Sequence, residues 1–350
     1  MYAVQLLNSH FVNRPWKQLS GLIVMIAALY VAGAVGMAYV AGFGAVHDRL
    51  VHARWWWLAP AGAAVAVAYI GYFFAYRAIN RVERGPTLEF PSLLAVVTAG
   101  FGGFLAQGGT ALDQFAMRAG GAREREAKVR VSALAGFEHG ALALIVCPAA
   151  IAALIVGSMY PRHDFTWPWA VIPPLGFALA IWLAERHRDR LRSREGWRGK
   201  LGLFYDSVHI VWEILRRPSS HGYAVLGMML YWGGDMFALW AATKAFGFAM
   251  TPLEVIVALG TGMVLTRRTA PLAGAGLVLL ALVATLWNAA GVPFAAATLG
   301  VAAYRLFTMF GPMPLGLTAL PKLRALGRRG EDSAGEGTGT TEGGEPALQH

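Results

Sequence analysis

Ionisable side chains that interrupt long apolar stretches are the residues of this sequence best suited to chemistry. Arg267 and Arg268 are adjacent in "LTRRTAPLAGAGLVLL", and the helix breakers Pro271, Gly274 and Gly276 follow at once. Guanidinium groups bind phosphate through paired hydrogen bonds, and the amino end of a helix also attracts negative charge. A helix that begins after the arginine pair would combine both effects, which indicates an anion-binding site.

Glu138, His139 and Arg305 carry ionisable groups inside two other apolar stretches. Charged residues at membrane depth are rare and usually face a cavity or a partner. Glu138 and Arg305 each lie about seven residues, or about 10 Å, from the end of a predicted helix, which gives them similar depths. The sequence therefore predicts a Glu138–Arg305 ion pair, within either a polar site or a structural crossing. Gly136 and Gly140 form a GxxxG pattern there, which permits close helix approach.

Two aspartates are also predicted to lie at membrane depth. Asp235 follows Gly233 and Gly234 near the middle of an apolar stretch. It indicates either a proton- or cation-coupling group or a structural partner for an arginine. Asp113, close to Arg118, either belongs to the same polar lining or marks the return of a hairpin to the membrane surface.

The composition predicts a membrane protein. Of the 350 residues 56% are hydrophobic and 14% are charged, whereas soluble domains contain about 25% charged residues. The net charge is +10, and most of the basic residues lie between the apolar runs. They do not gather on one soluble domain, so a nucleic-acid partner is not expected. Cys147 is the only cysteine, and no second histidine stands at ligand spacing from His139. Disulfides are therefore excluded, and neither a metal nor a cofactor is expected.

Six apolar stretches reach the length of about 20 residues that a spanning helix needs. They are residues 21–43, 55–77, 131–157, 167–184, 223–244 and 292–312. The most basic loops, 118–130 and 186–200, are predicted to be cytoplasmic because positive residues concentrate on that side of a membrane. The fold class expected is an all-α polytopic transmembrane bundle of about 6–8 spanning helices plus re-entrant segments, with both termini in the cytoplasm.

Three further apolar stretches contain helix breakers or charges. Residues 91–116 join two basic loops, so a single crossing is excluded and a re-entrant hairpin is predicted around its glycines. Residues 252–266 and 269–290 form either two crossings or one re-entrant pair. Arg267 and Arg268 lie in an ordinary cytoplasmic turn in the first case and at membrane depth in the second. The short length of 252–266 favours the re-entrant pair.

The sequence predicts one transmembrane domain, residues 21–320, between a cytoplasmic N-terminus, residues 1–20, and a disordered cytoplasmic tail, residues 321–350. Within the domain, residues 201–215 are amphipathic and follow a basic run. Such a helix is expected to lie in the cytoplasmic interface, with a polar face that includes Asp206.

The segments "ALGTGMVLTRRTAPLAGAGLVLLAL" and "GVPFAAATLGVAAYRLFTMFGPMPLG" resemble the lysylphosphatidylglycerol synthase transmembrane-region family of flippase-like proteins. The family pattern is a short segment, a proline–glycine break, an apolar run and a closing helix with an arginine. Pro271, Gly274, Gly276 and Arg305 match this pattern. The resemblance covers most of residues 15–320, and its N-terminal half fits more loosely.

Two positions depart from the family pattern. Ala273 replaces part of the glycine run, and Leu279 stands where family members commonly carry an acidic residue. Any role of that acid cannot be transferred to this chain. The soluble aminoacyl-transferase domain of the bifunctional members is absent, so lipid aminoacylation by this chain alone is not expected.

The resemblance implies movement of a polar or anionic phospholipid between the leaflets of the bacterial cytoplasmic membrane. Arg267 and Arg268 would hold the headgroup, and Glu138, Asp235 and Arg305 would line its path. One alternative is a membrane-embedded transferase acting on a lipid-linked substrate, although no catalytic constellation is visible. The other is a non-transporting partner of a separate lipid synthase. The sequence does not distinguish a monomer from a homodimer.

Overall fold

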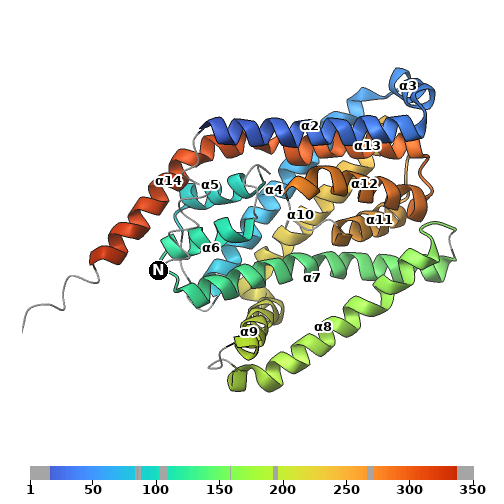
Figure 1. Ribbon diagram of the computed structural model, residues 1–350. Coiled ribbons are helices and arrows are strands. Elements are labelled where there is room, and N and C mark those ends of the chain that lie inside the picture. Colours follow the sequence, from blue (N-terminus) through green and yellow to red (C-terminus); the bar gives the residue numbers. More distant parts are fainter. Residues whose placement is uncertain are drawn as a thin grey trace, which may run out of the picture.

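Helices are the only regular elements in the described residues of this computed structural model, which are 16–82, 85, 88–101, 109–157, 159–191, 196–265 and 271–336. Six helical stretches are long and apolar enough to cross a membrane, at the positions that the hydropathy predicts. The predicted all-α polytopic bundle is therefore confirmed (Figure 1). The spanning helices are α2 (Trp16–Ala41), α4 (Leu58–Arg81), α7 (Glu124–Val156), α8 (His163–Leu191), α10 (Pro218–Ala245) and α13 (Phe294–Arg305), the last continuing into α14 (Pro312–Glu336).

Helices α4 and α10 are packed against each other backbone to backbone. A Cβ added at Gly234 would lie 2.5 Å from the Ala64 carbonyl oxygen, and one at Gly227 would lie 2.6 Å from the Gly71 carbonyl oxygen. Small side chains permit this approach because they leave the helix surface almost bare. On α4 they recur every three or four residues, as Ala61, Ala64, Ala68, Gly71, Ala75 and Ala78. On α10 they are Ala224, Gly227, Gly234, Ala238, Ala241 and Ala245, with an interval of seven residues between Gly227 and Gly234.

Each end of α4 is fixed by a cation. At its amino end, the Lys244 ammonium group lies 4.0 Å from the Trp57 ring centroid and 4.4 Å from that of Trp240. At its carboxyl end, the buried Arg130 of α7 donates hydrogen bonds to the carbonyl oxygens of Ile79, at 2.8 Å, and Asn80, at 3.4 Å. Those carbonyls belong to the last helical turn, where no backbone N–H of the same helix is available to them. Arg130 therefore supplies the missing hydrogen-bond donors.

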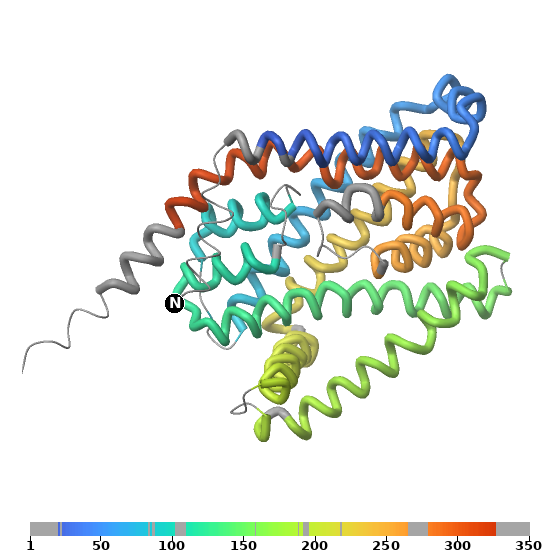
Figure 2. The backbone as a smooth tube through the Cα atoms, viewed as in Figure 1, coloured from blue at the N-terminus to red at the C-terminus, as the bar shows by residue number. Residues whose placement is uncertain are grey.

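Two pairs of short helices enter the bundle from opposite ends (Figure 1 and Figure 2). One pair is α5 (Phe90–Phe101) with α6 (Gly109–Ala119), and the other is α11 (Pro252–Leu265) with α12 (Pro271–Ala290). At 1.5 Å per residue, the 12, 11 and 14 residues of α5, α6 and α11 reach only about 16–21 Å, which is less than the roughly 30 Å of a hydrocarbon core. The pair α5–α6 therefore fits the predicted re-entrant hairpin. Helix α12 has 20 residues and reaches about 30 Å, so the lengths of α11 and α12 fit two crossings as well as a re-entrant pair.

The beginning of α7 differs from the sequence prediction. The helix begins at Glu124 and not at residue 131. Two ion pairs, each between residues one helical turn apart, stabilise the helix through the basic segment. Lys128 Nζ lies 2.6 Å from Glu124 Oε1, and Arg130 Nη2 lies 3.0 Å from Glu126 Oε1. Glu138 is therefore 14 residues, or about 21 Å, from the start of the helix, and not about 10 Å as predicted.

Helix α9 (Gly196–Arg216) contains the amphipathic stretch and crosses the spanning helices at one end of the bundle (Figure 1). Its polar face is buried in part. Asp206 is buried and accepts a hydrogen bond of 2.9 Å from Arg125 Nη2, while Ser207 donates one of 3.0 Å to the Val129 carbonyl oxygen. These contacts fasten α9 to the first turns of α7.

The chain ends lie as the predicted topology requires, since the start of α2 and the end of α14 are at the same end of the bundle (Figure 1). Helix α14 continues to Glu336, past the predicted tail boundary at residue 321, because Leu320, Leu323 and Leu326 are buried and α14 packs against α5. Residues 1–15 and 337–350 lie outside the described residues.

We expect Gly234→Ala to destabilise the protein by about 1–3 kcal/mol, the usual cost of overpacking, because the new methyl group would meet backbone atoms of α4. Thermal unfolding of the purified protein in detergent measures the effect. Gly233→Ala is the matched control, since a Cβ at that neighbouring position meets nothing within 4 Å. Equal melting temperatures for the two variants would contradict the backbone contact.

Candidate functional site

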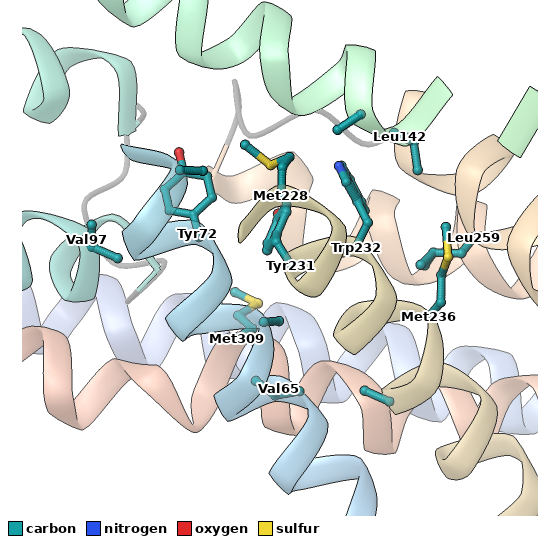
Figure 3. Close-up of a cluster of buried hydrophobic side chains, with 14 of the residues drawn as sticks. Val65, Tyr72, Val97, Leu142, Met228, Tyr231, Trp232, Met236, Leu259 and Met309 are labelled. Carbon is teal, nitrogen blue, oxygen red and sulfur yellow. The ribbon is translucent and has the colours of Figure 1, made fainter. Parts of the chain in front are cut away.

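Glu138 is a buried carboxylate held by α10. The Tyr231 hydroxyl donates a hydrogen bond of 3.0 Å to Glu138 Oε1, and the Trp232 indole nitrogen donates one of 2.7 Å to the Glu138 carbonyl oxygen. Tyr231 and Trp232 lie in the densely packed core below α7 (Figure 3). Two adjacent residues of α10 thus fix both the side chain and the backbone of Glu138.

The predicted ion pair between Glu138 and Arg305 is not formed. Helix α10 packs against both α7 and α13 and lies between them, so it separates the two side chains (Figure 1). The carboxylate of Glu138 meets Tyr231, and the Nη2 atom of Arg305 lies 3.6 Å from the thioether sulfur of Met309. The prediction was wrong because similar depth does not specify which helices are neighbours.

Arg305 instead belongs to a second cluster, on the other side of α10. The Tyr304 hydroxyl approaches the carboxylate of Asp235 closely enough for the two to interact, but without the geometry of a full hydrogen bond. Tyr30 of α2 lies within electrostatic range of Arg305 and donates a hydrogen bond to the Ala302 carbonyl oxygen. Helices α2, α10 and α13 therefore bring Tyr30, Asp235, Tyr304 and Arg305 together.

The Arg305 guanidinium lies where the regular helix ends. Residues Leu306–Phe310 form a π-helical turn (η3), closed by a hydrogen bond of 2.8 Å from the Gly311 nitrogen to the Leu306 carbonyl oxygen. Pro312 follows, and its missing N–H and bulky ring disfavour a regular α-helix at this point. Such turns often occur at functional sites. Among the described residues Arg305 has no carboxylate within 4 Å, and its buried Nε has no hydrogen-bond partner.

Asp113 of α6 is joined to the Glu138 cluster by aromatic side chains. It is buried and lies beside the Tyr76 hydroxyl of α4. From Tyr76 the ring contacts continue to Tyr72, at a centroid distance of 6.4 Å, and from Tyr72 to Tyr231, at 5.2 Å (Figure 3). Each of the three predicted carboxylates, on α6, α7 and α10, is therefore next to a tyrosine.

The remaining predicted site residues do not extend these clusters in the described part of the chain. His139 Nδ1 lies 2.7 Å from the Ala135 carbonyl oxygen of its own helix, and a carbonyl can only accept, so Nδ1 carries the proton. Gly274 and Gly276 belong to the first turns of α12, where only the backbone is described. Arg267 and Arg268 lie outside the described residues. No group of three or more His, Cys, Asp or Glu side chains among the described residues could hold a metal ion.

The tyrosines are the site residues that the sequence reasoning missed. Tyr69, Tyr72 and Tyr76 are spaced by three and four residues, which places them along one face of α4. That spacing was a readable signal, because a tyrosine buried at membrane depth needs a partner for its hydroxyl. Their partners come from other helices, and no pattern within one helix indicates those.

No family model matches this chain, and no curated protein sequence matches it. The membrane-spanning architecture therefore rests on the six long apolar helices.

We expect Arg305→Met to leave the stability unchanged or to raise it, because it removes a charge that has no carboxylate partner among the described residues. Arg130→Met is the contrasting variant. It should cost about 1.5–3 kcal/mol, since the Arg130 guanidinium donates to two carbonyls and to Glu126. Thermal unfolding in detergent compares them, and a larger loss for Arg305→Met than for Arg130→Met would show that Arg305 is structural.

Proposed function

We propose that this protein moves a polar or anionic phospholipid between the leaflets of the bacterial cytoplasmic membrane. The observation that carries the proposal is the Arg305 guanidinium, which lies in a spanning helix beside a π-helical turn without a carboxylate partner among the described residues. Arg305 is half-buried, and an arginine that is partly withdrawn from water within a spanning helix is stabilised by an anion, which offsets its desolvation. A lipid phosphate accepts paired hydrogen bonds from a guanidinium and is abundant in a membrane.

Three buried carboxylates support a polar path for the headgroup through the bundle. Asp113, Glu138 and Asp235 are each less than 9% exposed, and each lies next to a tyrosine. The anion would bind at Arg305, while the carboxylates and phenols would replace water around the polar part of the headgroup. Ionisable groups inside membrane segments commonly mark such transport paths.

The two pairs of short helices also favour transport. Discontinuous helices that enter from opposite ends are a recurring device of transporters, in which substrate sites lie near their inner ends. The inner end of α5 is near the proposed path, because the Phe101 ring lies 5.0 Å from that of Tyr72 and 6.0 Å from that of Tyr231.

Membership of the lysylphosphatidylglycerol synthase transmembrane-region family remains a proposal. It rests on the match of Pro271, Gly274, Gly276 and Arg305 to the family pattern. Leu279, which stands where family members carry an acid, is fully buried, and a Cβ at Gly33 of α2 would lie 3.5 Å from it. In this chain that position contributes apolar packing and supplies no carboxylate.

We expect Arg305→Met to lower the initial rate of leaflet transfer at least about tenfold, because loss of one charge-assisted contact to a phosphate costs 1.4 kcal/mol or more. The assay uses purified protein in vesicles that contain fluorescent phosphatidylglycerol, and dithionite reports the outer-leaflet fraction. Arg267→Ala combined with Arg268→Ala should cause a similar loss. Arg162→Gln is the control, since Arg162 is half exposed and pairs with Asp164 at 3.0 Å.

Transfer at the wild-type rate by Arg305→Met would refute the role of Arg305. Absence of transfer by the wild-type protein would instead favour a non-transporting partner of a separate lipid synthase.

A further inference from the structure

Helix α8 stands away from the rest of the bundle. It meets α7 at one end and α9 at the other, and it diverges from α7 between them (Figure 1). Thr166 and Ala184 are its only buried side chains among those described. Pro173 and Pro174 in mid-helix prevent a straight, continuous contact with α7.

The space between α7, α8 and α9 is a cavity of about 640 Å³ with an almost wholly apolar lining. Its volume falls within the range of about 300–1,000 Å³ that is typical of small-molecule sites. Along α7 it runs from Ser132 to Pro148, which is about 24 Å at 1.5 Å per residue. One leaflet of a hydrocarbon core of about 30 Å is about 15 Å deep, so a lipid acyl chain can lie along the groove.

The GxxxG residues of α7 open this groove and do not make the predicted close helix contact. A Cβ at Gly136 would meet only Val211 Cγ2, at 3.9 Å, and one at Gly140 would meet the Phe177 ring, at 3.3 Å. Both neighbours are side chains of α9 and α8 that also line the cavity. The glycines therefore give the groove its width.

Tryptophans and arginines mark one end of the groove. Trp212 lines it and donates a hydrogen bond of 3.1 Å to Glu185. Arg216 lies 5.6 Å from the Trp212 ring centroid, and its exposed guanidinium is 3.9 Å from the Glu185 carboxylate. Arg186 lies 5.6 Å from the Trp182 ring centroid on the facing helix. Tryptophan is typical of the headgroup level of a membrane, and clustered arginines attract anionic lipids. Further basic residues stand close by in the sequence, at Arg190, Arg198, Lys200 and Arg217.

We propose that the groove between α7, α8 and α9 holds one acyl chain of an anionic phospholipid, whose headgroup lies among the arginines at the α8–α9 end. The apolar lining and its position between two spanning helices identify an acyl chain, and the arginines select a negative headgroup. Glu138 projects from α7 toward Tyr231 of α10, whereas Gly136 and Gly140 face the groove. The groove is therefore separate from the Arg305 cluster, and lipid binding there does not depend on the proposed transport.

Gly136→Leu tests the groove directly, because Gly136 lines the cavity and a Cβ at this position would meet only Val211 Cγ2, at 3.9 Å. The wild-type protein in detergent, titrated with phosphatidylglycerol and measured by native mass spectrometry, should retain one tightly bound lipid. Gly136→Leu should weaken that binding at least about tenfold, because the space for the chain is filled. Gly36→Leu is the matched control on α2, where a Cβ meets nothing within 4 Å, and it should bind as the wild type does.

A comparison of two lipids tests the headgroup preference. Phosphatidylcholine should bind more weakly than phosphatidylglycerol, and Arg186→Gln combined with Arg216→Gln should remove the difference between the two lipids. Wild-type retention of phosphatidylglycerol by folded Gly136→Leu would overturn the proposal. A second outcome would also overturn it: the wild-type protein is a dimer, Gly136→Leu is a monomer, and lipid retention is the same in both. The groove would then hold a second copy of the chain. Equal binding of both lipids to the wild type would refute the headgroup site.

Discussion

The direct contact between the backbones of α4 and α10 is the constraint on which the rest of the structure depends. Glycine and alanine along the contact let the two helices approach until carbonyl oxygens of one helix meet glycine residues of the other. In a membrane such packing replaces the hydrophobic effect, because lipid and side chains are equally apolar. The pair then forms a fixed central unit against which α7, α13 and the short helices pack.

This unit also explains how a chain so apolar keeps ionisable groups inside it. Small residues occupy much of the α4 side of α10, and the polar groups of α10 also reach helices other than α4. Tyr231 and Trp232 point toward Glu138 of α7, while Asp235, one turn later, meets Tyr304 of α13. One helix thus orients two polar clusters on different sides. Each cluster is enclosed by apolar neighbours, which strengthens its electrostatic interactions.

Much of the fold could be predicted from the sequence, because the spanning segments follow from length and hydropathy alone. The start of α7 was predicted seven residues too late, since its first turns are stabilised by Glu–Lys and Glu–Arg pairs and not by apolar residues. The re-entrant hairpin predicted for residues 91–116, which the short helices α5 and α6 fit, followed from the positions of basic loops, because these constrain how often a chain can cross.

The candidate site was predicted only in part. Glu138, Asp113 and Asp235 were recognised as buried because charges in apolar stretches are conspicuous, and all three are buried. Their neighbours depend on the rotation and order of the helices, which hydropathy does not encode. For that reason Arg305 was paired with the wrong residue, the tyrosines were missed, and the GxxxG of α7 was assigned to a helix contact although it opens a cavity.

An experimental structure of the protein in nanodiscs that contain phosphatidylglycerol tests the central claim most directly. The account predicts density for a lipid phosphate within hydrogen-bond distance of the Arg305 guanidinium, beside Tyr304 and Asp235. A carboxylate paired with Arg305, with no lipid density near it, would contradict the account, because the charge would then be a structural partner within the bundle.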